Sequence, residues 1–475
     1  MTSNLYIICF ILLFFTACQD ILDKDPIATL DAGSFFQSSD DALQALNTAY
    51  RPLLLNNDNN SFYWAFANIT SDLSITGGDG SRPGLVELDA FTYTPRTEEF
   101  NTFWRLQYDG ITQCNLVLDN LPDIELDEAL LDQYTGEALF LRSFYYFQLA
   151  QTFGGVPLFL NVAPPDELKI PRSTREAILT QVQRDCEQAA LLLPTTYSAL
   201  NVGRATRGAA LALAAKAYLY EEKWDKVLES IDQVKALGIY ELVSDYQDNF
   251  TEGKQNNTES VWEVQHANLE LGVGNFLNQW LKSKKVEGYG FAEVTEDYFN
   301  SFDDDDPRRR FAIASKDEEY FGSIYKNSYS STKHSTRKYL QDTTITQLAD
   351  GSINYTPIRY AEVLLWEAEA LAELGRVSEA QAPLEEVRAR ARAQAGDPAT
   401  ALPMISTTDK NEMIDAIRHE RVLELGFEFH RFFDLVRWGI AADILPDFQT
   451  DKNELFPLPQ TEMDLNPALV QNPGY

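Results

Sequence analysis

The sequence predicts a mainly α-helical protein in which stacked helix pairs pack against an irregular, loop-rich half. Two segments, 215–236 and 368–389, align without a gap at a constant offset of 153 residues. Small residues such as Ala217 and Ala370 coincide in this alignment, and apolar residues recur at the three- and four-residue spacing of an amphipathic helix. Because small residues allow paired helices to approach closely, the repeat predicts helix pairs that stack to bury their apolar faces.

Both segments resemble tetratricopeptide units, and further helix pairs are expected, since fewer than three would hardly be stable. Segment 134–153 is apolar almost all round, which predicts a helix covered on several sides. Gly154 and Pro157 predict where that helix ends. The expected repeat helices occupy about 40–55, 98–153, 173–237, 357–393 and 409–438.

Two of these segments carry helix-start signals. Ser173 and Glu176 have the spacing of a capping box, and Asp409 is expected to begin a long helix that ends near Trp438. Segment 260–265 alternates like a short strand. Binding surfaces are usually built on loops, and the irregular, variable stretches are expected at about 57–97, 239–356, 394–407 and 440–475.

The charge balance excludes nucleic acid as a partner. The chain has 39 Lys and Arg residues against 72 Asp and Glu residues, a formal net charge of −33. Such a surface repels phosphate backbones, whose binding needs clustered cations.

No motif predicts a metal centre, a cofactor or a catalytic site. The aspartates at 303–306 lack the ligand spacing of a calcium loop and precede arginines at 308–310, so a solvated loop is expected, with calcium as the alternative. The run 77–80 lacks the Lys-Ser/Thr of a phosphate loop and is expected to be a flexible loop. Cys114 and Cys186 fall in helical patterns and are expected to be buried free thiols.

The amino-terminal segment resembles a lipoprotein signal peptide. Residues 5–16 form an apolar run that has the length of a signal core and is too short to span a membrane comfortably. Small residues precede Cys18 as in a lipobox, although Phe15 stands where Leu is usual. We expect cleavage of 1–17 and acylation of Cys18, with an unlipidated secretory signal as the alternative. The acidic run directly after Cys18 resembles the export signal of surface-exposed lipoproteins.

Six runs in order along the chain together resemble the SusD/RagB family of outer-membrane nutrient-binding lipoproteins. They include the start after the leader, the LRSFYYF and FGGVPL runs, the IRYAEVLL run and the FDLVRWG run. The runs lie at 18–23, 141–158, 204–210, 358–365, 420–439 and 456–475.

This resemblance implies a single, mainly α-helical domain of about four tetratricopeptide-like helix pairs packed against an irregular, variable half. It implies a partner, a SusC-like TonB-dependent barrel, over which the lipoprotein sits as a lid at the cell surface. It also implies that the protein binds oligosaccharide or polysaccharide, delivers it to that transporter, and is not an enzyme. A repeat scaffold that binds protein or peptide is the alternative, and a surface glycosidase is a further one.

Exposed aromatic rings are the natural contacts for the apolar C–H faces of sugars, and the positions of the seven tryptophans divide them into two groups. Those in helical or strand patterns are expected to pack in the core: Trp104, Trp224, Trp262, Trp366 and Trp438. The predicted sugar contacts lie in the irregular stretches, with core packing of a loop as the alternative: Trp64, Asn68, Asp72, Trp280 and Tyr289.

Overall fold

The structure is a computed structural model that describes residues 36–56, 59, 61–269, 271–342 and 349–475. The predicted leader and Cys18 lie outside the described residues. Within them, no helix is long and apolar enough to cross a membrane.

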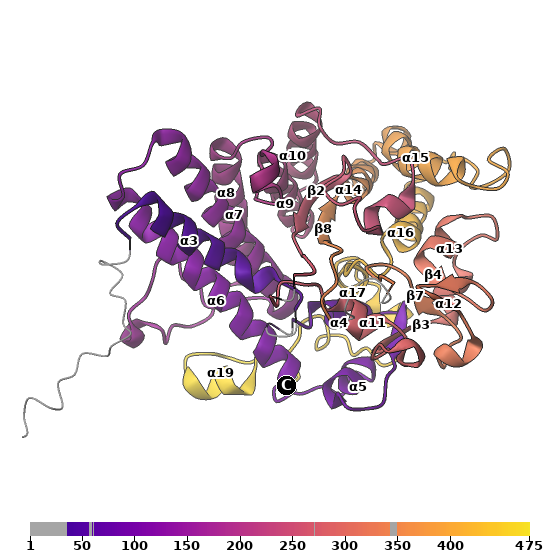
Figure 1. Ribbon diagram of the computed structural model, residues 1–475, viewed down its shortest axis with the longest axis horizontal. Helices are drawn as coiled ribbons and strands as arrows, with labels where there is room; N and C mark the ends of the chain where they lie inside the picture. Colours follow the sequence, from indigo (N-terminus) through magenta and orange to yellow (C-terminus); the bar gives the residue numbers. More distant parts are fainter. Residues whose placement is uncertain (1–35, 57–58, 60, 270, 343–348) are drawn as a thin grey trace, which may run out of the picture.

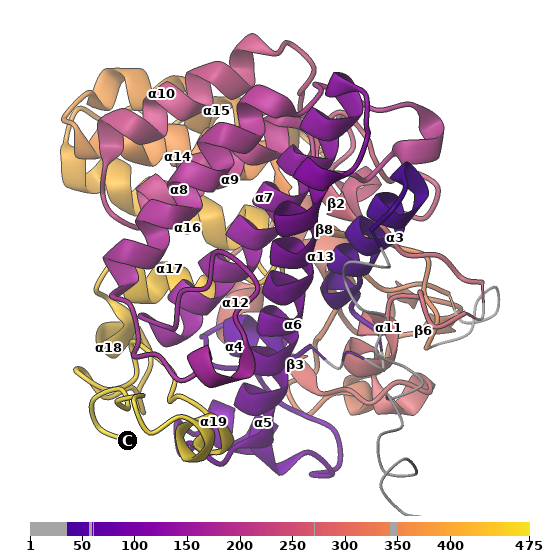
Figure 2. The ribbon, with the colours of Figure 1, turned by 90° about the vertical axis from the view of Figure 1, so that its left-hand side faces the viewer.

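The helical half is a row of helices in which each packs on the next (Figures 1 and 2). α3 packs on α6 and α7, and the chain of contacts then runs from α6 to α7, α8, α9, α10 and α14, which packs on both α15 and α16. This arrangement confirms the predicted mainly α-helical, tetratricopeptide-like fold. The helices are α3 (Ser39–Tyr50), α6 (Glu98–Asn120), α7 (Glu128–Phe153), α8 (Arg175–Leu192), α9 (Arg207–Leu219), α10 (Trp224–Ala236), α14 (Tyr360–Glu373), α15 (Val377–Ala393) and α16 (Lys410–Leu425).

Local sequence signals place most helix ends. Asp127 caps α7 by accepting from the Leu130 amide at 2.9 Å, and the helix ends at Gly154, whose φ of +75° suits glycine. Asp409 caps α16 as predicted, with acceptor distances of 2.8 and 3.1 Å to two amides. The cap of α8 is Thr174 and not Ser173.

The long helix predicted from Asp409 to Trp438 is wrong, because the chain breaks it after Leu425. α16 ends there, and a separate helix, α17 (Arg431–Arg437), follows. Between them Phe427 and Phe429 adopt left-handed φ values of 64° and 72°, which no continuous helix accommodates.

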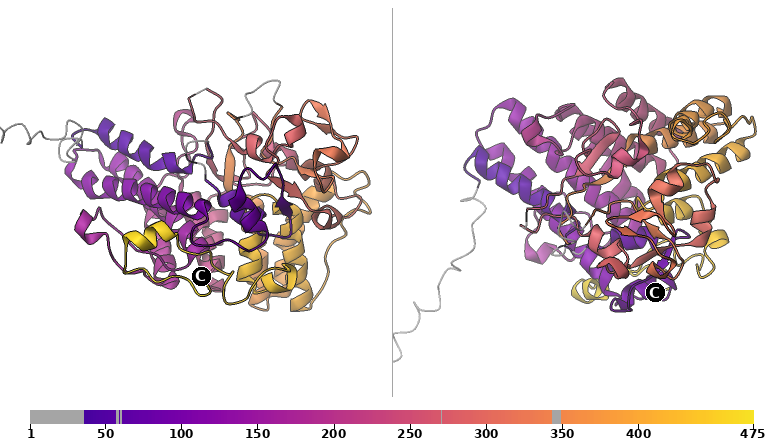
Figure 3. Two further views of the ribbon diagram at one scale, coloured as in Figure 1. Left: turned by 90° about the horizontal axis from the view of Figure 1, so that it is seen from below. Right: turned by 45° about the vertical axis from the view of Figure 1, so that its right-hand side comes forward.

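The other half consists of short helices and two-stranded ladders (Figure 3). The strand expected at 260–265 is present as β2 (Ser260–Val264), which pairs antiparallel with β8 (Tyr355–Arg359). The other ladders are β1 (Ser74–Thr76) with β3 (Ala292–Val294), β4 (Ile313–Ala314) with β7 (Ser335–Thr336), and β5 (Glu319–Tyr320) with β6 (Ser323–Ile324). The short helices are α4 (Tyr63–Asn68), α5 (Pro83–Asp89), α11 (Leu277–Leu281), α12 (Glu296–Asn300), α13 (Arg308–Ala312), α18 (Ala441–Ile444) and α19 (Gln460–Leu465).

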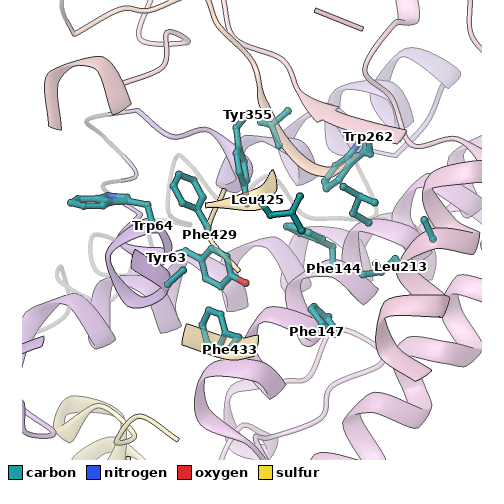
Figure 4. Close-up of a cluster of buried hydrophobic side chains, with 14 of the residues drawn as sticks. Tyr63, Trp64, Phe144, Phe147, Leu213, Trp262, Tyr355, Leu425, Phe429 and Phe433 are labelled. Carbon is teal, nitrogen blue, oxygen red and sulfur yellow. The ribbon is translucent and has the colours of Figure 1, made fainter. Parts of the chain in front are cut away.

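An aromatic core joins the two halves (Figure 4). Tyr63 of α4 stacks between Phe103 of α6 and Phe433 of α17, with ring centroids 5.8 and 5.4 Å away. On the helical side, Trp262 of β2 packs edge-on against Phe144 at 4.9 Å. Apolar burial of this extent is the main stabilising term of the fold.

Buried ion pairs also connect the halves, and Glu424 of α16 lies at their centre. Its carboxylate accepts from Arg308 at 3.0 Å, from Arg359 at 2.6 Å and from Arg390. The carboxylate has no exposed surface. Burial alone would raise the pKa of Glu424, but the three arginines outweigh it and hold that pKa below its ordinary value.

Arg359 of β8 also pairs with two further glutamates. It donates to Glu428 at 2.6 Å and to Glu259 at 2.7 Å, and Lys338 donates to Glu428 at 2.7 Å. We call this set the central ion network: Glu259, Asp306, Arg308, Lys338, Arg359, Arg388, Arg390, Glu420, Glu424 and Glu428. It includes side chains from β8, α13, α15 and α16 together with their connecting loops.

Glu424→Gln should lower the free energy of unfolding by about 3–5 kcal/mol, because removing one member leaves buried cations without compensation. Urea titration monitored by circular dichroism measures the change. Glu379→Gln is the matched control, since Glu379 forms an exposed pair with Arg376 and its loss should leave stability nearly unchanged. Equal stability of both variants would contradict a structural role for the network.

His266 predicts a separate dependence of stability on pH. Its Nε2 accepts from the Leu55 amide at 3.1 Å, and its Nδ1 lies 3.0 Å from the Val264 carbonyl, so the buried ring is neutral. Burial lowers the pKa of His266 to about 4. Because the unfolded chain then binds the proton more readily, stability falls as pH decreases from about 6.5 toward 4.

The variant His266→Gln isolates this contribution. Between pH 7 and pH 5 the wild type should lose about 2 kcal/mol more stability than the variant, the amount expected for this pKa difference. Urea titrations of both proteins at the two pH values measure it. An identical loss in both would show that His266 does not titrate differently on folding.

Candidate functional site

Two loops that are distant in the sequence meet in a row of aromatic rings. Trp64 of α4 stacks on Trp280 of α11 with centroids 5.7 Å apart, and Phe276 packs edge-on against Trp280 at 5.2 Å. Phe276 lies 6.3 Å from Tyr289, which in turn lies 5.1 Å from Phe291. The row leads from the core to the surface, because Trp64 is 0% and Trp280 2% exposed, whereas Tyr289 is 42% exposed.

The backbone around Tyr289 is held by hydrogen bonds to α11. The Tyr289 amide donates to the Gln279 carbonyl at 2.7 Å, and the Phe291 amide donates to the Trp280 carbonyl at 2.9 Å. Directly beyond, β3 pairs with β1 and brings Gly78 beside this segment. A Cβ at Gly78 would lie 3.0 Å from the Phe291 ring, so glycine permits this approach.

Polar side chains extend from the two chain segments that meet at this site. Asp79 accepts from Lys284 at 2.7 Å, and both residues are exposed. The hydrogen bonds from Lys284 and Ser81 lower the pKa of the Asp79 carboxyl. Arg82 lies over the Phe62 ring at 5.4 Å. The exposed tyrosine ring offers a stacking face, and the charged groups on these segments offer donors and acceptors for hydroxyl groups.

The five predicted contacts fall into different environments. Trp64, Asn68 and Trp280 are buried, which favours the core-packing alternative for their side chains. Asp72 is half-buried and forms a two-pronged ion pair with Arg431, with both oxygen–nitrogen distances 2.7 Å. Tyr289 is the most exposed of the five residues.

Sequence reasoning missed Asp79, Arg82 and Lys284 as neighbours of this site. The run 77–80 was expected only to be a flexible loop, and the loop at 283–289 lies some 200 residues away in the chain, as the Lys284–Asp79 bond illustrates. The pair of glycines at 77 and 78 is the sequence signal that could have indicated this contact, because glycines allow the two loops to approach closely.

Two family profiles match the chain. One, described as "Starch-binding associating with outer membrane", matches residues 39–219, and the other, described as "SusD family", matches residues 258–445. The chain belongs to the SusD/RagB family. The two matches do not overlap and together cover most of the described residues.

Relatives of this SusD/RagB chain match it along almost its full length. SusD-like protein P25 from Formosa agariphila is 25% identical, over 100% of this chain and 99% of its own. SusD-like protein P2 from the same organism is 26% identical over 99% of both chains. Among solved structures, a "Laminarin binding SusD-like protein" is 29% identical with a TM-score of 0.81, covering 93% of this chain and 100% of its own.

A second solved structure shares the fold. Surface glycan-binding protein A from Bacteroides thetaiotaomicron, in complex with laminarihexaose, is 22% identical with a TM-score of 0.79, over 92% of this chain and 100% of its own. SusD/RagB proteins bind glycans without catalysing a reaction, which confirms that this chain is a binding protein and not an enzyme. The family description places such proteins in association with the outer membrane.

Core packing and direct sugar contact make opposite predictions for Trp280. If the ring is a core element, Trp280→Ala should lower the free energy of unfolding by about 3–5 kcal/mol, the usual cost of truncating a buried aromatic side chain. Thermal and urea unfolding measure the change. A variant that keeps wild-type stability but loses glycan retention would instead identify the ring as a sugar contact.

Proposed function

We propose that the protein captures a neutral glycan at the cell surface through the site around Tyr289, and delivers it to a SusC-like TonB-dependent barrel. The observation that carries the proposal is the exposed Tyr289 ring, which packs against Phe276 and Phe291 on a backbone segment held to α11 by two hydrogen bonds. A ring fixed before binding loses little conformational entropy when a sugar stacks on it.

Charge favours a neutral ligand over an acidic one. The chain carries a formal net charge of −33, so its field repels uronate-rich or sulfated polysaccharides at a distance. The likeness to a laminarin-binding SusD-like protein makes laminarin, a neutral β-glucan, the first ligand to test.

The membrane attachment and the transporter are proposed from the sequence. The apolar run 5–16 followed by Cys18 supports cleavage and acylation, which would hold the protein at the outer membrane with its glycan site outward. Labelling with a radioactive fatty acid should modify the wild type and leave Cys18→Ala unlabelled. Purification of the tagged protein from mildly solubilised membranes tests the partnership. A TonB-dependent barrel should co-purify with it, and a preparation without such a barrel would overturn the proposed partnership.

Tyr289→Ala should weaken retention in native gels that contain laminarin by roughly two- to tenfold, the range of a single aromatic contact. Its melting temperature should change less than that of Trp280→Ala, because Tyr289 is 42% exposed whereas Trp280 is buried. Tyr289→Phe is the matched control, since it keeps the stacking face and loses only the hydroxyl.

Two results would contradict this proposal. Wild-type protein that passes through gels of laminarin and of other neutral polysaccharides without delay would remove the glycan function. Retention of Tyr289→Ala equal to that of the wild type would move the binding surface away from Tyr289.

A further inference from the structure

The helical half contains a cavity of about 520 Å³ that lies on other elements than the Tyr289 site. It lies among α8, α10, α14, α16 and α17, close to the chain segment around Glu454 (Figure 2 shows these helices grouped on one side of the molecule). Its volume falls within the usual range for small-molecule sites, roughly 300–1,000 Å³.

A ladder of alternating cations and rings lines this cavity. Arg175 and Arg437 both lie over the Tyr220 ring, each at 5.9 Å from its centroid. Arg437 also lies over the Trp438 ring at 4.8 Å, and Arg418 lies over the same ring at 5.1 Å. The ladder fixes both aromatic rings and all three guanidinium groups beside the cavity.

The middle of the ladder is neutralised by Glu369. Arg437 donates to its two oxygens at 2.5 and 2.7 Å, and the Trp438 indole donates to it at 2.8 Å. The opposite carboxylate of the lining, Glu373, pairs with Lys410 at 2.7 Å. These groups are therefore satisfied within the protein.

The two ends of the ladder are not satisfied in this way. Within the described part of the chain, neither Arg175 nor Arg418 forms an ion pair within 4.0 Å, and the buried Nε of each donates no hydrogen bond. Burial lowers the pKa of Arg175, as expected for a guanidinium removed from water. Buried donors without acceptors are costly, so a ligand that accepts from them would be stabilised.

The same cavity lining also contains carboxylates that form no ion pair within the described residues. Among the described residues, no cation lies within 4.0 Å of the Glu222 or Glu454 carboxylate, and Glu454 accepts only the Asp451 amide at 3.0 Å. Trp224 is half-buried in the lining and has no aromatic or cationic contact in the described structure, which leaves a ring available for stacking.

We propose that this cavity is a second carbohydrate subsite, which binds one or two neutral sugar residues over Trp224. An anion would pair with the arginines but would be repelled by the two carboxylates, and a cation would pair with the carboxylates but would be repelled by the arginines. A hydroxyl group both donates and accepts hydrogen bonds, so it can bind to the arginines and to the carboxylates. The proposal rests on the proposed glycan function and adds a second point of attachment, which strengthens the retention of long chains by raising the effective concentration at each site.

The test uses laminarin gels and isothermal titration with laminarihexaose on the full-length protein. Trp224→Ala and Arg418→Gln should each weaken binding, Arg418→Gln by about tenfold if one charge-assisted hydrogen bond is lost. Arg184→Gln is the matched control, because Arg184 is an exposed arginine of α8 outside the lining and should bind as the wild type does. Tyr289→Ala combined with Trp224→Ala should bind more weakly than either single variant.

The outcomes separate this inference from the proposed function. Wild-type affinity in both Trp224→Ala and Arg418→Gln, with binding still reduced by Tyr289→Ala, overturns the second subsite alone. Failure of the wild type to bind any neutral glycan overturns the proposed function. If a cavity variant unfolds, a crystal of the wild type soaked in laminarihexaose decides: sugar density at Trp224 supports the subsite, and density confined to Tyr289 overturns it.

Discussion

The buried charges of the central ion network constrain how the two halves of the protein can pack. Glu424 accepts from arginines of α13, β8 and α15, and all four side chains are buried. A buried carboxylate is tolerated only when its partners are present in the correct geometry. A shift of the loop-rich half relative to the helices would therefore separate charges at low dielectric.

The network also explains why the chain bends where the sequence predicts a straight helix. Glu420 and Glu424 lie one helical turn apart on α16, but Glu428 reaches Arg359 and Lys338 only after the helix has ended. Phe427 and Phe429, in left-handed conformations, flank it and pack in the aromatic core. Periodicity continues through this segment, so pattern analysis finds one helix where tertiary contacts select two.

The helix pairs could be predicted because their signals are local: the 153-residue repeat, the cap at Asp409 and the end at Gly154 each depend on a few neighbouring residues. The site could be predicted only as two loops rich in aromatic residues. Sequence cannot distinguish Trp280, which faces Trp64 in the core, from Tyr289, which reaches the surface nine residues later. It likewise assigned Trp224 and Trp438 to the core, whereas both are half-buried beside a cavity formed by helices from distant parts of the chain.

The distribution of cations connects the stability of the protein with the ligand it can attract. Several of its 39 Lys and Arg residues are buried in the central ion network, where they neutralise an equal number of buried carboxylates. The acidic excess consequently lies toward the solvent, and the long-range field disfavours polyanions whatever a local site offers. Arginines that do face a cavity, as Arg175 and Arg418 do, are stacked on aromatic rings and accompanied by carboxylates, a combination that favours hydroxyl groups over charge. The long-range field and the chemistry of this lining therefore both favour the proposed class of ligand, an uncharged polyhydroxylated chain.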